Sequence, residues 1–201
     1  MDSTFGICGK DWCIVVCDSS VNRSIFNLKR GEDKIAEIDS KTVLGLSGEQ
    51  TDRSTFSSLV TRNLKLNEYK MGFKANLDQQ AQFTRTLLAE ALRQGPYQVN
   101  CLLGGYCDQD NEAKLYWMDY LGTLQRVTRG AQGYANYFVS SVLEKHFKKD
   151  LTLDEGKKAI SDCILELTTR FIINSPEYLM KIITKDGIEV VKLEAPKVPT
   201  A

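Results

Sequence analysis

Hydrophobic and polar positions come in blocks along the chain, and the first block predicts strands. A continuous apolar run at residues 12–17 predicts a buried strand, preceded by a shorter extended segment at residues 4–7. Alternating positions at residues 34–39 and an apolar segment at residues 42–46 predict a hairpin. Residues 19–30 are mostly polar, so we expect irregular structure between these strands.

The next block has apolar residues spaced three to four apart, which predicts two helices. Ser47, with Gln50 three positions later, is a candidate N-cap residue for a first helix that reaches about residue 69. Asn76 is a candidate N-cap residue for a second helix over residues 77–93.

The second half repeats this order of strands, two helices and strands. The predicted strands are residues 99–106, residues 114–118 and a short strand after a turn at 121–123. The predicted helices are residues 134–147 and a long helix that begins at a capping box, residues 152–155. A last hairpin is predicted to pair residues 179–184 with residues 188–193. Because strands and helices come in blocks, we predict an α+β fold with antiparallel sheets. We expect one domain, residues 1–193, and an extended C-terminal arm, residues 194–201, which contains two prolines.

Composition and charge exclude several classes of protein. The 201 residues include 26 basic and 26 acidic side chains, so the net charge is zero and gives no electrostatic basis for nucleic-acid or membrane binding. The chain has no run of 18 apolar residues and no pattern of a secretory signal. We therefore expect a protein of the cytoplasm and nucleus.

The six cysteines predict buried, reduced thiols rather than a metal site. None forms a C-x-x-C motif, and Cys13 and Cys17 would share a strand face about 13 Å apart, too far for a disulfide. A zinc site is not expected, since His146 is the only histidine. We expect neither a cofactor nor a metal, and we treat the Asn22-Arg23-Ser24 glycosylation sequon as a chance match.

Many dispersed segments, in register with this order of elements, resemble the proteasome β subunits. These segments are residues 4–7 (TFGI), 9–11 (GKD), 16–18 (VCD), 34–35 (KI), 47–48 (SG), Asp52, Gly133 and 152–156 (TLDEG). Residues 96–100 (PYQVN), 102–106 (LLGGY), 116–121 (YWMDYL) and 170–174 (RFIIN) further resemble the non-catalytic beta type-2 branch, which occupies the fourth position of the β ring. The resemblance covers essentially the whole chain and implies the N-terminal-nucleophile hydrolase fold, a four-layer αββα sandwich of two antiparallel sheets between helix layers.

The resemblance also implies where an active site would lie. Active members attack the scissile carbonyl with the hydroxyl of a threonine at the mature N-terminus, and its free amine, or a water beside it, takes the proton. In register, that position falls on Asp2, which has no hydroxyl, and no propeptide is expected before it. The supporting positions are kept: Asp18 as the orienting carboxylate, Lys34 as the lysine that lowers the nucleophile's pKa, and Gly48 as the N–H donor of the oxyanion hole.

Three other family positions are replaced by different residue types. Tyr134 takes the place of a serine before the third helix, Phe171 that of a second aspartate, and Asn174 that of a following serine. Phe171 can neither accept a proton nor a hydrogen bond. We therefore expect Asp18 and Lys34 to be a structural ion pair and Gly48 a glycine at a helix start.

The function implied is that of a non-catalytic structural β subunit of the 20S proteasome, which acts in ubiquitin-dependent and other intracellular protein degradation. Its implied partners are other β subunits in a heptameric ring, the α ring and the opposite β ring, with no nucleic acid and no membrane. One alternative is an active peptidase after trimming to Ser3 or Thr4. Others are a free-standing binding domain, and a triad of Ser19 or Ser20 with His146, which lacks a supporting motif.

Overall fold

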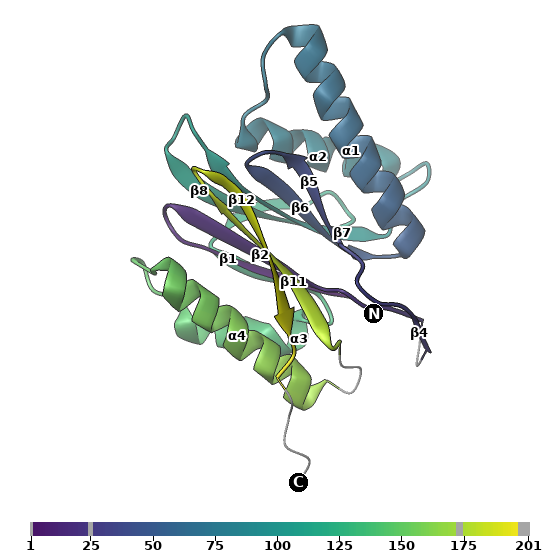
Figure 1. The fold of residues 1–201 in the computed structure, drawn as a ribbon. Helices are drawn as coiled ribbons and strands as arrows, with labels where there is room; N and C mark the ends of the chain where they lie inside the picture. Colours follow the sequence, from purple (N-terminus) through teal and green to yellow (C-terminus); the bar gives the residue numbers. More distant parts are fainter. Residues whose placement is uncertain (1, 24–25, 172–174, 197–201) are drawn as a thin grey trace.

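Two five-stranded antiparallel sheets form the middle of the molecule (Figure 1). They are seen in a computed structural model that describes residues 2–23, 26–171 and 175–196. In spatial order the first sheet contains β10 (Arg129–Gly133), β1 (Ser3–Cys8), β2 (Trp12–Asp18), β11 (Glu177–Thr184) and β12 (Gly187–Glu194). The second contains β5 (Ile35–Asp39), β6 (Thr42–Gly48), β7 (Val99–Cys107), β8 (Glu112–Met118) and β9 (Leu124–Val127).

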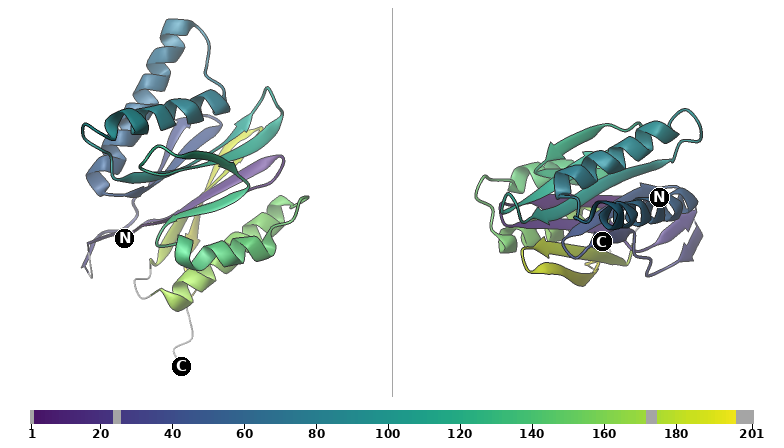
Figure 2. Two further views of the ribbon diagram at one scale, coloured as in Figure 1. Left: turned by 180° about the vertical axis from the view of Figure 1, so that it is seen from behind. Right: turned by 90° about the horizontal axis from the view of Figure 1, so that it is seen from above.

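Two pairs of helices cover the outer faces of these sheets (Figures 1 and 2). Helices α1 (Gln50–Met71) and α2 (Leu77–Ala91) pack on the second sheet, and α3 (Asn136–His146) and α4 (Leu153–Arg170) pack on the first. Besides the apolar contacts between helices and sheets, an apolar layer lies between the two sheets. It includes Val15 and Cys17 of β2 and Leu102 of β7. The predicted four-layer αββα architecture of the N-terminal-nucleophile hydrolases is confirmed.

Most predicted elements lie where the hydrophobic pattern placed them. Asn76 caps α2 as predicted, its side chain accepting from the Gln79 N–H, and the predicted capping box forms at α4, where the Thr152 side chain accepts from the Glu155 N–H. The last hairpin turns at residues 185–186, since Thr184 pairs with Gly187. The division into a domain of residues 1–193 and an arm stays a prediction: β12 extends to Glu194, and residues 197–201 lie outside the described part of the chain.

The predicted start of the first helix is wrong. Ser47 lies inside β6 and pairs with Asn100 of β7, and its hydroxyl has no hydrogen-bond partner among the described residues. The N-cap residue is instead Glu49, whose carboxylate accepts from the backbone N–H groups of Thr51 and Asp52. The sheet therefore continues through the segment that the capping pattern assigned to the helix.

Three short strands were not predicted. The polar segment expected to be irregular forms a two-stranded hairpin of β3 (Val21–Arg23) and β4 (Phe26–Lys29). Strand β10 follows β9 after one residue and passes into the other sheet, where it pairs with β1. Strands this short give too little alternation for a hydrophobic pattern to reveal.

Two further observations concern the cysteines and the helices. All six cysteines are buried with free thiols, as predicted. Among the described residues, no helix combines the length and apolar character needed to span a bilayer.

Close packing of α4 on β2 generates the first prediction. A Cβ atom on Gly156 would lie 2.2 Å from the Trp12 ring, which is itself buried. Replacing a helical glycine by alanine ordinarily stabilises by about 0.5–1 kcal/mol. Gly156→Ala is instead expected to lower the free energy of unfolding in urea by about 1–3 kcal/mol, because the helix must move off the indole.

Gly95→Ala is the matched control, since no atom lies within 4 Å of its Cβ position. This variant is expected to change the unfolding free energy by no more than about 0.5 kcal/mol. A Gly156→Ala protein as stable as the unmodified chain would contradict the packing described.

Candidate functional site

A buried ammonium group, that of Lys34, holds two carboxylates where the two sheets meet. Lys34 immediately precedes β5, Asp2 precedes β1, and Asp18 is the last residue of β2. The Lys34 Nζ lies 2.7 Å from Asp2 Oδ1 and 2.8 Å from Asp18 Oδ2, and it donates a third hydrogen bond to the Ser20 carbonyl oxygen at 2.7 Å. An ammonium has three donors, so all of them are used.

The second oxygen of Asp2 lies against the backbone of the other sheet. Its Oδ2 accepts from the Gly48 N–H at 3.0 Å and lies 3.4 Å from Arg53 Nε. The Arg53 guanidinium also pairs with Glu32 at 3.3 Å. The N–H that the resemblance assigns to an oxyanion hole is therefore bound to the chain's own carboxylate.

Asp18 fixes the start of β1 from the neighbouring strand. Its second oxygen accepts from the Ser3 N–H at 2.7 Å. On the other side of the cluster, Gly48 has a φ of 140°, and a Cβ there would lie 2.0 Å from the Gln98 carbonyl oxygen. Only glycine fits this backbone, so the N–H that faces Asp2 depends on it.

Burial and the ionic contacts of the cluster shift the pKa values of its three charged groups in opposite directions. Burial opposes the charge of Asp2, but Lys34 and Arg53 outweigh it and hold the pKa of Asp2 below its usual value. Burial dominates at Asp18 and raises its pKa, although Lys34 opposes the shift. Burial also disfavours the charge of Lys34, but its two carboxylates more than compensate and raise its pKa. Lys34 is therefore a fixed cation at neutral pH and is not available as a base.

Two of the replaced family positions meet in an aromatic cluster. The rings of Tyr134 and Phe171 stack with centroids 5.5 Å apart, and Phe171 also contacts Phe138 at 5.6 Å. The Tyr134 N–H donates to the backbone carbonyl of Asp2 at 3.0 Å. Aromatic rings therefore stand where the resemblance implies a serine hydroxyl and a carboxylate, and Asn174 lies outside the described residues.

The serine and threonine side chains considered as alternative nucleophiles are bound to other groups of the chain. Ser3 and Thr4 are buried within β1, between β10 and β2, and the Thr4 hydroxyl donates to the Leu46 carbonyl at 3.3 Å. The alternative triad does not form, because His146 pairs with Asp162 at 2.9 Å. The Ser19 hydroxyl donates to the Glu177 carbonyl, and the Ser20 hydroxyl is hydrogen-bonded to that of Ser175 at 2.9 Å.

Arg53 is the functional residue that sequence reasoning missed. Its side chain is only 5% exposed, although charged residues on a helix are usually solvated. The signal was present in the spacing, since Arg53 lies three and seven residues before Phe56 and Val60 on the buried stripe of α1. Within the described part of the chain, no three His, Cys, Asp or Glu residues gather as metal ligands would.

Comparison with known families matches residues 2–183 to the family described as "Proteasome subunit". "Proteasome subunit beta type-2-B" of Arabidopsis thaliana is 40% identical over 187 residues, which cover 93% of this chain and 94% of that protein. "Proteasome subunit beta type-2" of Dictyostelium discoideum is 39% identical over 94% of this chain and 96% of its own length. "Proteasome subunit beta type-4" of Saccharomyces cerevisiae is 33% identical over 95% and 97%.

Loss of the Lys34 ammonium is expected to destabilise the protein strongly. In Lys34→Met the carboxylates of Asp2 and Asp18 stay buried without their shared counter-ion, at a cost of about 3–5 kcal/mol. Equilibrium unfolding in urea measures this loss. Lys41→Met is the control, because Lys41 pairs with a largely exposed Asp108 and is expected to cost no more than about 1 kcal/mol. Equal losses in the two variants would contradict the buried pairing.

The opposite pKa shifts of Asp2 and Asp18 predict opposite dependences of stability on pH. The folded pKa of Asp2 lies below its usual 3.8, so its stabilisation is complete above that pH and is lost as the pH falls through the folded value. The folded pKa of Asp18 lies above 3.8, so the unfolded chain releases this proton first and stability falls as the pH rises through that window.

Urea unfolding at a series of pH values separates the two effects. Asp2→Asn is expected to remove a loss of stability on the acid side of pH 3.8, and Asp18→Asn to remove a loss on its alkaline side. Slopes that change in the same direction in both variants would show that the charges are not divided as described.

Proposed function

The chain belongs to the proteasome subunit family, and we propose that within it the chain is a non-catalytic structural β subunit of the 20S core particle. Its task is to complete the β ring and to form part of the wall of the proteolytic chamber in ubiquitin-dependent and other intracellular protein degradation. Its proposed neighbours are other β subunits in a heptameric ring, the α ring and the opposite β ring. The proposed location is the cytoplasm and nucleus.

The geometry of Asp2 carries the proposal of inactivity. The carboxylate has no hydroxyl to activate, and both of its oxygens are bound, one to Lys34 and one to the Gly48 N–H. A tetrahedral intermediate would need that N–H, and a nucleophile would need the space beside the ammonium. The side chain thus fills the site with a group that cannot react there.

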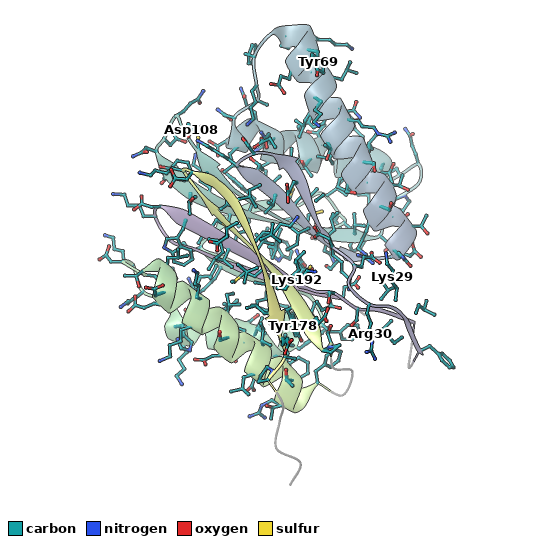
Figure 3. The ribbon with its side chains drawn as sticks, viewed as in Figure 1. Lys29, Arg30, Tyr69, Asp108, Tyr178 and Lys192 are labelled. Atoms are coloured by element: carbon teal, nitrogen blue, oxygen red, sulfur yellow. The ribbon has the colours of Figure 1, made fainter. Side chains whose placement is uncertain are left out.

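An exposed apolar arm supports assembly with other subunits. The β3–β4 hairpin stands off the body of the molecule (Figure 1), and Phe26 and Leu28 on it are 66% and 62% exposed. An isolated two-stranded hairpin is marginally stable in water. Lys29, which ends β4, and the next residue, Arg30, are labelled in Figure 3 and add positive charge beside these side chains. An apolar arm of this kind favours burial against a neighbouring subunit.

The alternative of an enzyme trimmed to Ser3 or Thr4 is not favoured by the packing. The Ser3 N–H is bound to Asp18, and residues 4–7 pair with strands on both sides. Exposing Thr4 as an N-terminus would remove Asp2, leaving the Gly48 N–H and one of the three Lys34 donors without their acceptor. That loss is costly at a buried site.

Purification through an affinity tag on this chain tests both parts of the proposal. Native mass spectrometry is expected to find the chain in a multi-subunit particle, and a monomer would contradict the structural role. The particle is then treated with a threonine-directed covalent peptide inhibitor and digested. Labelled peptides are expected from other subunits only, which also serve as the positive control. A label on residues 2–4 of this chain would overturn the proposed inactivity.

A further inference from the structure

Two cysteines face each other across the β1–β2 hairpin, away from the charged cluster. Cys8 and Cys13 are directly opposite in the register of the strands. The adjacent pair toward the turn is joined by a hydrogen bond from the Gly9 N–H to the Trp12 carbonyl at 2.9 Å, whereas the Cys8 N–H donates outward to Thr128 of the β9–β10 connection at 2.7 Å. Cys8 and Cys13 therefore form a non-hydrogen-bonded pair, in which side chains approach most closely and Cα atoms lie about 4.5 Å apart.

That spacing falls inside the range that disulfides require, about 4.4–6.8 Å between Cα atoms. Both side chains belong to the apolar cluster between the sheets. A hydrogen bond with the Cys8 thiol, together with burial, raises the pKa of Cys13 well above its usual value. The Cys8 thiol also donates to the Gly9 carbonyl at 3.2 Å. The register of the strands therefore places the pair at a spacing that suits a disulfide.

No other pair of cysteines in the described sheets has this relation. Cys17 is opposite Thr4, Cys101 is opposite Met118, and Cys107 is opposite Glu112. Cys163 lies on α4. In the described sheets, a disulfide between paired strands is therefore possible only between Cys8 and Cys13.

Access also distinguishes the two members of the pair. Cys8 is 6% exposed and lies beside the exposed turn residues Lys10 and Asp11, whereas Cys13 is fully buried between the sheets. A small uncharged oxidant that enters at the turn meets Cys8 first. Figure 1 shows this turn at the opposite end of the hairpin from the N-terminus, so a link here leaves Asp2 and Asp18 in place.

We propose that Cys8 and Cys13 are a site of reversible oxidation, at which a peroxide closes an intrachain disulfide. The Cys8 sulfur attacks one peroxide oxygen, the O–O bond breaks, and Cys8 becomes a sulfenic acid as one water leaves. The Cys13 sulfur then attacks the Cys8 sulfur, the S–O bond breaks, and the hydroxide departs with the Cys13 thiol proton as a second water. Two thiols are oxidised, one hydrogen peroxide is reduced, and a small thiol reverses the reaction by exchange.

Peptide mapping of the folded full-length chain tests the site. The protein is treated with hydrogen peroxide, the reagent is removed with catalase, free thiols are alkylated, and the chain is digested with trypsin. Cleavage after Lys10 separates residues 1–10, which contain Cys8, from residues 11–23, which contain Cys13 and Cys17. The expected product is these two peptides joined, lighter than their sum by two hydrogen atoms, and released by dithiothreitol. Absence of the joined peptides after treatment would overturn the proposal.

Two variants assign the partner within the second peptide. Cys13→Ala is expected to abolish the link, and Cys17→Ala, on the same strand and in the same peptide, is expected to leave its yield unchanged. Circular dichroism checks that both variants are folded, and a variant of either cysteine that unfolds is replaced by the corresponding Ser substitution. A link that survives in Cys13→Ala, or that disappears in folded Cys17→Ala, would contradict the assignment. The proposal is independent of the proposed role in the proteasome.

Discussion

The shared, buried ammonium of Lys34 is the polar constraint on which this end of the fold depends. An apolar layer lies between the two sheets, and Lys181 of β11 crosses it to Glu37 of β5, but at this end three charged side chains meet. Lys34, just before β5 of the second sheet, binds Asp2, just before β1, and Asp18 of β2 in the first sheet. Asp2 in turn accepts from the Gly48 N–H of β6. Buried charges are tolerated only when they are paired and hydrogen-bonded, so each partner holds the others in place.

The same contacts connect stability to the proposed inactivity. In a catalytic arrangement the lysine and the glycine N–H would face a hydroxyl and a developing negative charge. Here the Asp2 carboxylate binds both the Lys34 ammonium and the Gly48 N–H. Beside them, the stacked rings of Tyr134 and Phe171 take the place of the family's polar groups. Groups that could stabilise a developing negative charge thus stabilise the fold, because the charge they bind is that of the Asp2 carboxylate. Under the proposed structural role the subunit supplies surface, including the exposed β3–β4 arm.

The sequence predicted the layers and most elements because strong patterns determine them. Buried strands such as residues 12–17 and caps such as Asn76 and Thr152 are encoded locally, and the structure places them as expected. The start of α1 was wrong because pairing with β7 extends β6 through Ser47, a tertiary effect that a capping pattern cannot register.

The site itself was predicted only in part. Asp18, Lys34 and Gly48 do meet at the position of Asp2, but Gly48 ends a strand rather than opening a helix. Sequence gave no indication that Asp2 would bind both the lysine and the glycine N–H, or that Arg53 would be buried beside it, because both depend on how the two sheets stack. The contact between Tyr134 and Phe171 likewise joins residues 37 positions apart in the sequence, which no local pattern connects.

An experimental structure of the assembled particle, at a resolution that separates carboxylate oxygens, tests the central claim most directly. The account predicts that Asp2 is present and ordered, with one oxygen near 2.7 Å from Lys34 Nζ and the other near 3.0 Å from the Gly48 nitrogen. A chain that begins at Ser3 or Thr4, with a hydroxyl directed at the Lys34 ammonium and a free Gly48 N–H, would contradict it.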